Sequence, residues 1–305
     1  MTQSRAYLFV TLGAALWGCV GIFVNGLSAR GVSAIQIASL RMVGGTAVLL
    51  VWMIRSAPHR LRLRRPADVR LFILTGAVSI AVFQWSYLSA IRSVGMSAAV
   101  VLLYTSPGFV VIFARLLFGE RITGPKILCL LAMFVGVVAV SGVIGGDSGV
   151  RLSVQGTILG LLAGLSFSLY TVVGKFALQR YGAQTVTVYT FAAAAIALTP
   201  AVLIDPTPFP WSSLPVYLWA AGIIAVPTVG AYMVYAMGLS QVESGRAAIV
   251  GTVEVLVAVV IGVIFFGDHA GASQLAGTAL IIAAALGVRA SAPISRVSPT
   301  GLRRR

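Results

Sequence analysis

The sequence contains the same hydrophobic unit twice, and this repeat restricts the fold more than any single motif does. Residues 85–138 align with residues 233–286 without a gap at a shift of 148. The aligned part includes two matching motifs, Phe118-Gly119-Glu120-Arg121 and Phe266-Gly267-Asp268-His269. Each half holds five hydrophobic segments. Because five is odd, the second half enters the membrane from the opposite side. The pattern predicts an inverted repeat, an architecture of many secondary transporters.

The composition indicates that these segments belong in lipid. Hydrophobic residues make up 59% of the 305 residues, against 22 Lys and Arg and 7 Asp and Glu. Ten apolar windows, each long enough to cross about 30 Å of hydrocarbon, lie at 6–28, 33–54, 68–91, 97–118, 124–144, 153–177, 183–204, 213–238, 245–266 and 270–289. An isolated strand leaves its backbone unsatisfied in lipid, so we expect an all-α membrane protein with ten transmembrane helices.

The windows divide the chain into two repeats and a tail. We expect the first five-helix repeat over residues 6–144, the second over 153–290, and a basic tail over 291–305. The tail is rich in Ser and Arg, and we expect it to be disordered in the cytoplasm near an anionic inner leaflet. The first window lies where a secretory signal would, but it carries Trp17 and leads into nine more spans. We therefore interpret it as an uncleaved helix.

The cationic residues predict which side of the membrane each loop faces. The net charge is +15, but it is spread over loops and not gathered on a basic domain, so we expect no nucleic-acid partner. With the N-terminus in the cytoplasm, 17 Lys and Arg lie on the cytoplasmic side, and only Arg30, Arg92 and Arg151 lie outside. We therefore predict both termini in the cytoplasm and a multi-pass protein of the plasma membrane, the inner membrane of a bacterial cell.

The sequence offers no catalytic or metal-binding pattern. The two cysteines, Cys19 and Cys129, lie inside apolar spans, which argues against a disulfide or a metal site. We find no Walker motif, no zinc-ligand spacing and no nucleophile with a neighbouring base. We expect no cofactor, no enzymatic activity and no ATP-driven pump.

Several short motifs resemble a known transporter family. The segment Leu116-Leu117-Phe118-Gly119-Glu120-Arg121-Ile122-Thr123 resembles the repeat ending of the EamA family in the drug/metabolite transporter superfamily. Ala15-Leu16-Trp17-Gly18, Leu40-Arg41 and Thr252-Val253-Glu254 resemble further landmarks of that family. The resemblance covers about residues 8–289. It implies ten helices with cytoplasmic termini, a central cavity formed mainly by spans one, three, four, six, eight and nine, and transport of a small metabolite.

The sequence departs from the family pattern in two places. Val255 stands where relatives often carry proline, which puts a proline hinge in span nine in doubt. The Arg41 position falls on Phe191 in the second half, so Arg41 serves one half only. We interpret Arg41 as a structural group, an ion pair or a carbonyl clamp between helices, with Glu254 as a possible partner; the alternative is a counter-charge for a substrate carboxylate.

Glu254 is the acid that lies deepest in a predicted span. It follows Arg246 by eight residues, which places it roughly 12 Å into the bilayer. A charge there costs on the order of 3 kcal/mol unless it is paired or hydrated. We therefore predict that Glu254 binds substrate and carries a proton for coupling. The alternative is a neutral or ion-paired packing element.

Polar and aromatic residues within the spans suggest the rest of the site. The substrate-binding candidates are Trp17, Gln84, Tyr104, Tyr170, Tyr232 and Glu254. Core packing explains each aromatic residue about as well, but Gln84 and Tyr232 are equivalent under the shift. Pro107 and Pro227 should kink spans four and eight. Lys175 is expected to extend to the headgroups.

The leading hypothesis is a secondary transporter that exports amino acids or related small metabolites by alternating access, with or without proton coupling. Its expected partners are a small-molecule substrate and membrane lipid; the oligomeric state is left open. The alternative within transport is an exchanger of phosphorylated solutes such as nucleotide sugars, which would need several cations in its cavity. From another class, an intramembrane scaffold or enzyme would need an extramembrane surface or a catalytic set.

Overall fold

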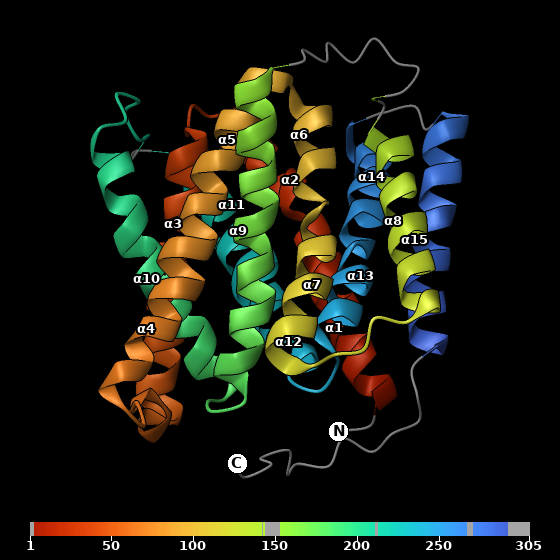
Figure 1. Cartoon of the computed structure of the whole chain (residues 1–305). Helices are drawn as coiled ribbons and strands as arrows, with labels where there is room; N and C mark the ends of the chain where they lie inside the picture. Colours follow the sequence, from red (N-terminus) through yellow and green to blue (C-terminus); the bar gives the residue numbers. More distant parts are fainter. Residues whose placement is uncertain (1–2, 142, 144–152, 211–212, 267–270, 292–305) are drawn as a thin grey trace.

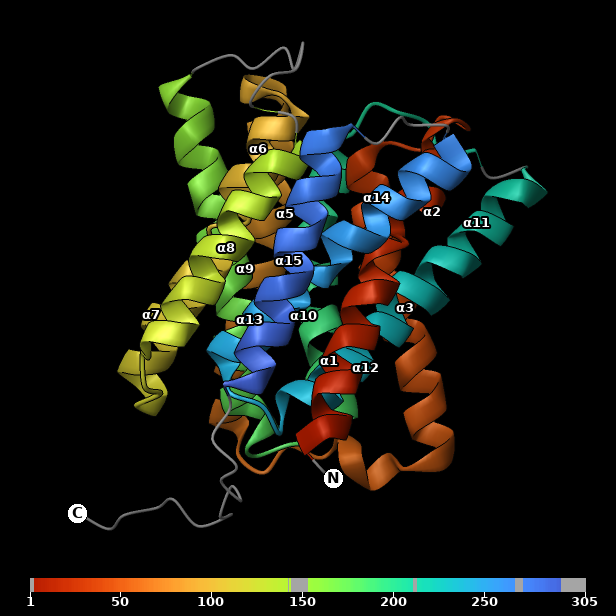
Figure 2. The ribbon, with the colours of Figure 1, turned by 90° about the vertical axis from the view of Figure 1, so that its right-hand side faces the viewer.

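The protein is an upright bundle of membrane-length helices (Figures 1 and 2). The computed structural model describes residues 3–141, 143, 153–210, 213–266 and 271–291. Within these residues there are no strands. Ten helical segments are long and apolar enough to cross a membrane: Gln3–Ser28, Ala34–Ser56, Pro66–Val94, Ala98–Phe118, Gly124–Ser141, Val154–Leu178, Ala183–Leu203, Leu214–Leu239, Ser244–Phe265 and Ala272–Ala290. The prediction of an all-α protein with ten spans is confirmed.

Several spans consist of more than one helix. The first half contains α1 (Gln3–Gly18), α2 (Val20–Ser28), α3 (Ala34–Ser56), α4 (Val69–Phe72), the π-helix η3 (Ile73–Ala81), α5 (Val82–Val94), α6 (Met96–Leu103), α7 (Ser106–Phe118) and α8 (Gly124–Ser141). The second half contains α9 (Val154–Leu178), α10 (Ala183–Leu203), α11 (Leu214–Ile224), the π-helix η4 (Ala225–Gly230), α12 (Ala231–Leu239), α13 (Ser244–Gly251), α14 (Val253–Phe266) and α15 (Ala272–Ala290). Two 3₁₀ turns, Pro58–Leu61 and Pro66–Asp68, lie between α3 and α4.

The two halves run in opposite directions. The start of the first span meets the end of the tenth, where Arg289 donates to the hydroxyl of Ser4 at 2.9 Å. In Figure 1, α1 begins at the lower end of the bundle, whereas α9, the first helix of the second half, begins at the upper end. This is the arrangement expected of an inverted repeat. The cytoplasmic assignment of the lower end and the repeat bounds stay predictions. Residues 292–305 of the predicted tail and the motif residues 267–270 lie outside the described residues.

Spans four and nine are broken at equivalent positions. Span four is interrupted at Tyr104 and Thr105, and span nine at Thr252, which the shift of 148 pairs with Tyr104. In each break a threonine hydroxyl bonds a carbonyl three residues back: Thr105 to Leu102 at 2.6 Å, and Thr252 to Ile249 at 2.7 Å. The backbone N–H of the same threonine also donates to that carbonyl, at 3.2 Å in span four and 3.3 Å in span nine, so each break ends its helix in a tight turn that the hydroxyl reinforces.

The two proline positions differ in their effect. Pro107 lies in the first turn of α7, where its missing N–H costs nothing, so the predicted kink is a complete break just before it. Pro227 lies inside η4 and leaves the Ile223 carbonyl without its usual partner. The Thr228 hydroxyl takes that carbonyl at 2.8 Å. Span nine breaks without any proline, since Val255 stands at the position equivalent to Pro107.

A row of small residues on α9 holds the break of span four. A Cβ at Gly164 would lie 2.8 Å from the Thr105 hydroxyl, and one at Gly160 would lie 2.7 Å from the Cβ of Leu102. Only glycine allows α6 to approach α9 this closely. The break at Tyr104 therefore packs closely against the middle of α9.

Candidate functional site

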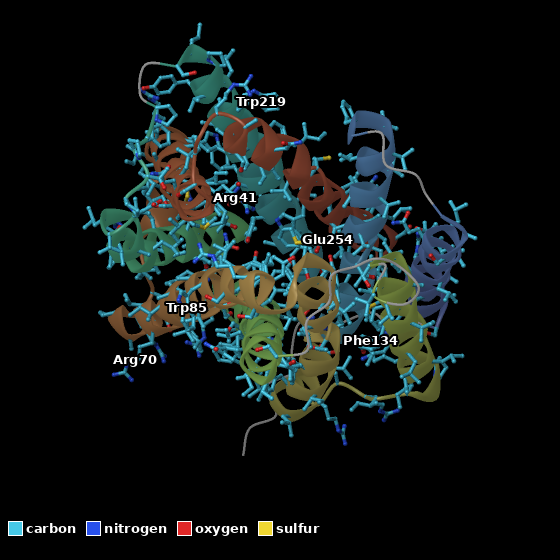
Figure 3. The ribbon with its side chains drawn as sticks, turned by 90° about the horizontal axis from the view of Figure 1, so that it is seen from above. Arg41, Arg70, Trp85, Phe134, Trp219 and Glu254 are labelled. Atoms are coloured by element: carbon cyan, nitrogen blue, oxygen red, sulfur yellow. The ribbon has the colours of Figure 1, made fainter. Side chains whose placement is uncertain are left out.

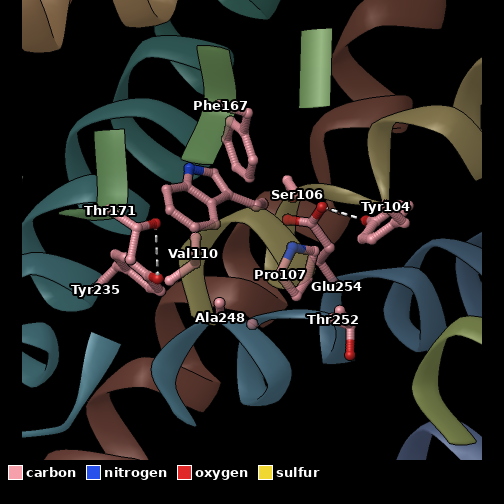
Figure 4. Close-up of a pocket in the computed structure, with 12 residues that line it drawn as sticks. Tyr104, Ser106, Pro107, Val110, Phe167, Thr171, Tyr235, Ala248, Thr252 and Glu254 are labelled. Atoms are coloured by element: carbon pink, nitrogen blue, oxygen red, sulfur yellow. Dashed lines mark hydrogen bonds between the residues drawn. The ribbon is translucent and has the colours of Figure 1, made fainter. Parts of the chain in front are cut away.

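A small cavity lies where the broken spans meet (Figure 4). Its volume is about 20 Å³, enough for a water molecule but not for a metabolite. The lining residues come from spans one, four, six, eight and nine: Trp17, Tyr104, Ser106, Pro107, Val110, Phe167, Thr171, Tyr235, Ala248, Gly251, Thr252 and Glu254. Span three, which the family resemblance implied as a further wall, contributes no residue to this lining.

Tyr104 and Glu254 form the polar centre of the cavity. The Tyr104 hydroxyl donates a hydrogen bond to the Glu254 carboxylate (Figure 4). Tyr104 is buried at the end of α6, and Glu254 lies in the first turn of α14. The positive end of a helix dipole favours a negative charge there. No described Lys, Arg or His forms an ion pair with Glu254. The hydroxyl and the helix end thus take the place of a cation.

Aromatic rings form one wall of the cavity around Trp17. The Trp17 ring lies 4.9 Å from Tyr232, 4.7 Å from Tyr235 and 6.4 Å from Tyr170, measured between centroids. Tyr170 and Tyr232 support Trp17 without lining the cavity themselves. The indole N–H of Trp17 is buried and has no hydrogen-bond partner among the described residues. A buried donor of this kind is available to a water or to a solute oxygen.

Arg41 is a clamp on span eight and not a partner of Glu254. Its Nε donates to the Thr228 hydroxyl at 3.0 Å, and a terminal nitrogen contacts the Pro227 carbonyl at 3.4 Å. Both acceptors lie in the π-helix η4, where the backbone hydrogen bonding departs from the regular α-helical pattern. Arg41 and Glu254 approach the middle of the bundle from different sides (Figure 3). The interpretation of Arg41 as a carbonyl clamp agrees with this geometry.

Gln84 does not line the cavity, contrary to its predicted place. Phe83 and Tyr87, which are one turn apart on α5, stack at 5.6 Å, and Phe83 packs against Phe167 at 5.2 Å. Gln84 follows Phe83 directly in the sequence and is absent from the residues that line the cavity. The equivalence with Tyr232 matches positions along the two halves of the sequence. It does not give the side chains that surround each position.

The predicted site left out four polar residues of the lining: Ser106, Thr171, Tyr235 and Thr252. Thr171 and Tyr235 are linked through their hydroxyls at 3.4 Å (Figure 4). Tyr235 lies one turn after Tyr232, and Thr171 directly follows Tyr170. Helical spacing from the residues already chosen could therefore have pointed to Tyr235.

A charged network closes the bundle at the end where the chain begins. The Glu120 carboxylate accepts from the backbone N–H of Ser244 at 2.6 Å and of Gly245 at 3.2 Å. It thereby caps α13, whose own N-cap residue, Glu243, makes no side-chain capping bond. Buried Lys126 lies 3.5 Å from Glu120 and 3.0 Å from Glu243.

Arg246 extends this network to the end of the tenth span. Its Nε lies 2.8 Å from Glu243, and its terminal nitrogens donate to the carbonyls of Val288 at 2.6 Å and Ser291 at 3.2 Å. Burial alone would raise the pKa of Glu243, but hydrogen bonds from Arg246 and Lys126 outweigh it and hold this pKa below its ordinary value. Spans four, five, nine and ten are thus tied together at one end.

The opposite end of the bundle is held by fewer polar contacts among the described residues. Asp205 accepts from the Ser33 hydroxyl, and Gln36 donates to the Thr207 carbonyl at 2.6 Å. The hydrogen bond from Ser33, helped by the backbone N–H of Thr207, holds the pKa of Asp205 below its ordinary value. These contacts join span two to the segment after span seven and leave spans four and nine unlinked.

The sequence model of the EamA-like transporter family matches residues 4–142 and 154–290, which is most of the chain. The chain belongs to the EamA-like transporter family. The protein is therefore a multi-pass membrane transporter, in agreement with the expectation of transport and not catalysis. The two matched segments cover the two halves described above.

The sequence is also similar to individual transporters from other organisms. The chain is 28% identical to an uncharacterized transporter of Archaeoglobus fulgidus over 281 residues, 91% of this chain and 93% of the relative. It is 26% identical to the threonine/homoserine exporter RhtA of Escherichia coli K12 over 257 residues, 84% of this chain and 82% of the relative. A solved structure 18% identical in sequence shares the fold, with a TM-score of 0.78 over 94% of this chain and 96% of that one. Bacterial relatives agree with the predicted location in the inner membrane.

Proposed function

We propose that this transporter exports amino acids or related small metabolites by alternating access, and that Glu254 carries the coupling proton. The observation that carries the proposal is the Glu254 carboxyl, bonded to Tyr104 where two broken helices meet. Broken spans near the bilayer midplane are a common setting for substrate and ion sites in secondary transporters. A carboxyl without a fixed cation is free to exchange its proton with whichever side is open.

The polar groups of the cavity suit a small zwitterion. Glu254 can accept from an ammonium group, and the unpartnered N–H of Trp17 can donate to a carboxylate. The rings of Phe167 and Tyr235, which line the cavity beside Trp17, offer apolar faces for a short side chain. The threonine/homoserine exporters among the relatives support the same substrate class.

The cavity lining gives less support to phosphorylated solutes. None of the twelve residues that line it is Lys or Arg. Arg41 is not part of the lining, and its guanidinium donates to the Thr228 hydroxyl and the Pro227 carbonyl. A site for a phosphate or nucleotide sugar would need free cations at this place.

Alternating access is supported by the asymmetry of the two ends. The network around Lys126 ties spans four, five and nine at the end where the chain begins. The water-sized cavity then corresponds to an occluded form that must widen before a metabolite enters. The breaks at Tyr104 and Thr252 supply the places where spans four and nine can bend.

The substrate class can be tested by counterflow. Purified protein in liposomes loaded with unlabelled solute should take up the labelled solute for some amino acids, and not for nucleotide sugars. A pH difference across the liposome membrane should drive the labelled solute to accumulate inside the liposomes. Counterflow with nucleotide sugars alone would contradict the proposal.

The proton role can be tested with a variant pair that the repeat provides. Glu254→Gln keeps size and hydrogen bonding but cannot titrate, so it should still exchange solute yet fail to accumulate it under a pH gradient. Ser106→Ala, at the equivalent place in the first repeat, should accumulate within about twofold of wild type. Full accumulation by Glu254→Gln would remove Glu254 as the proton site.

The aromatic wall can be tested with two tryptophans. Trp17→Ala removes the ring that Tyr232 and Tyr235 support and should lower exchange about tenfold or more. Trp85→Ala removes a ring that is 56% exposed on the outside of the bundle and should leave exchange unchanged. Equal exchange by both variants at equal expression would show that Trp17 only packs.

A further inference from the structure

A second and larger cavity lies at the end of the bundle where the chain begins. Its volume is about 450 Å³, within the range typical of ligand sites, against about 20 Å³ at the centre. It lies between the segment after α3 and the turn that joins α9 to α10. Four arginines, Arg60, Arg62, Arg64 and Arg180, dominate its lining, together with His59.

The segment that carries these arginines is held in place by its backbone. Thr185 donates to the Arg60 carbonyl at 2.8 Å, and Tyr189 donates to the Leu61 carbonyl at 2.6 Å. The backbone N–H of Arg64 donates to the Tyr181 hydroxyl at 2.9 Å. The positions of the arginines around the cavity are therefore set before any ligand arrives, which lowers the entropic cost of binding.

The protein leaves most of this positive charge without a counter-charge. Asp68 is the acidic residue closest in sequence to these arginines. One of its carboxylate oxygens accepts from Arg180 at 2.6 Å, and the other accepts from the Tyr181 hydroxyl at 2.5 Å. Arg60 bonds only the neutral Gln184 side chain, at 2.8 Å. Of the described carboxylates, none forms an ion pair with Arg60, Arg62 or Arg64. Three arginines held together repel one another unless an anion joins them.

A helix end adds to the positive field. The 21-residue helix α10 begins beside the cavity, with Gly182 as its N-cap and no side-chain capping bond. Gly182, Gln184 and Thr185 all line the cavity. The free N–H groups of this first turn favour an anion at the same place as the arginines do.

Lipid-facing side chains lie close to the cavity along the chain. Trp52 and Ile54, in the last turns of α3, are 47% and 59% exposed, and Val69, at the start of α4, is 43% exposed. Such a border of apolar side chains and a tryptophan marks the level of the headgroups. The cavity therefore opens where phosphates of membrane lipids and phosphates from solution are both within reach.

We propose that this arginine cavity binds a phosphate-bearing anion, either the headgroup of an anionic phospholipid or a soluble phosphate. Guanidinium groups bind phosphate oxygens through paired hydrogen bonds. The excess of positive charge that is common in cytoplasmic loops would not by itself require arginines gathered around one cavity. Occupancy would tie the segment after α3 to the start of α10, across the boundary between the two halves. The site is separate from the central cavity and does not depend on the proposed substrate.

The test compares two double variants of the full chain in neutral detergent. Arg62→Gln/Arg64→Gln removes two lining cations whose side chains are exposed, and Arg115→Gln/Arg121→Gln removes two exposed cations from the segment around the end of α7. Binding of phosphatidylglycerol is measured by native mass spectrometry and by thermal shift, with phosphatidylcholine as the neutral lipid. Inorganic phosphate and pyrophosphate form the soluble arm.

We expect the anion to bind wild type and the Arg115/Arg121 variant alike, and the Arg62/Arg64 variant about tenfold more weakly. Addition of about 0.5 M NaCl should reduce the difference. A preference for phosphatidylglycerol over the inorganic anions identifies a lipid, and the reverse identifies a soluble phosphate. Equal binding of every anion by the two double variants would overturn the site.

Discussion

Span four and span nine share a backbone but not a chemistry. Both are broken at the position that the repeat makes equivalent, Tyr104 in one and Thr252 in the other. Two residues further on, span four has Ser106 where span nine has Glu254. Both residues line the central cavity, yet only the second half supplies an acid, and its hydroxyl partner comes from the first half.

The difference shows which features the duplication preserved. Both halves have kept a threonine at the break, whose backbone N–H and hydroxyl both donate to the carbonyl three residues back. A single half-buried carboxyl is tolerable because one hydroxyl and one helix end stabilise it, whereas a second acid nearby would repel it. The two halves therefore differ at the cavity although their backbones match.

The largest expected effect is a loss of stability when the contact between the end of span four and the start of span nine is removed. Glu120→Ala removes the carboxylate that caps α13 and leaves Lys126 with one carboxylate fewer. The variant should be destabilised by about 3 kcal/mol, measured by thermal unfolding in detergent. Arg121→Ala, next in sequence and exposed, should cost less than about 0.5 kcal/mol. Equal stability of the two variants would mean that span nine holds its start without span four.

The next effect separates the two break residues. Tyr104→Phe removes the hydroxyl that bonds Glu254 and should reduce substrate exchange about tenfold, the usual effect of losing a hydrogen bond to a charged group. Thr252→Val removes only a bond to the Ile249 carbonyl and should lower stability by about 1 kcal/mol with a smaller change in exchange. Counterflow and thermal unfolding on both variants give the comparison. Unchanged exchange in Tyr104→Phe would break it.

A smaller effect tests whether the proline causes the break in span four. Span nine breaks with Val255 at the position of Pro107, and the Thr105 hydroxyl already satisfies the Leu102 carbonyl. Pro107→Ala should therefore keep the fold and change stability by no more than about 1 kcal/mol. Thermal unfolding and exchange are the measurements. A loss of several kcal/mol would show that the two breaks have different causes.

The smallest expected effect is a pH dependence of stability that comes from the start of span nine and has no counterpart at the start of span four. Gly95 begins span four where Glu243 begins span nine. Because the folded-state pKa of Glu243 lies below its ordinary 4.5, its stabilisation is present above that value and is lost as pH falls through the folded pKa. The stability difference between wild type and Glu243→Gln should thus stay constant from about pH 7 to about pH 5 and shrink as the pH falls below about 4.5. A difference that does not change with pH would exclude this carboxylate as the source.

The sequence predicted the fold more fully than it predicted the site. Few backbone arrangements are stable in lipid, so ten hydrophobic windows were enough to predict ten helices. The odd number of spans in each half predicted that the second half runs in the opposite direction. The same reasoning selected Glu254, because a buried acid is costly wherever its neighbours lie. Gln84 was chosen as a polar residue within a predicted span that is equivalent to Tyr232, and neither of the two lines the cavity.

By itself the sequence determined the ten apolar spans, the doubled unit and the deep acid, because these depend on composition and on spacing along one chain. Only the tertiary structure decided which groups meet. Lys175, expected to reach the headgroups, instead donates to the Val242 carbonyl, and Arg41 clamps Pro227 and Thr228. Tyr104 reaches Glu254 across 150 residues of sequence. Such contacts depend on how helices of the two halves pack, and no local pattern records that.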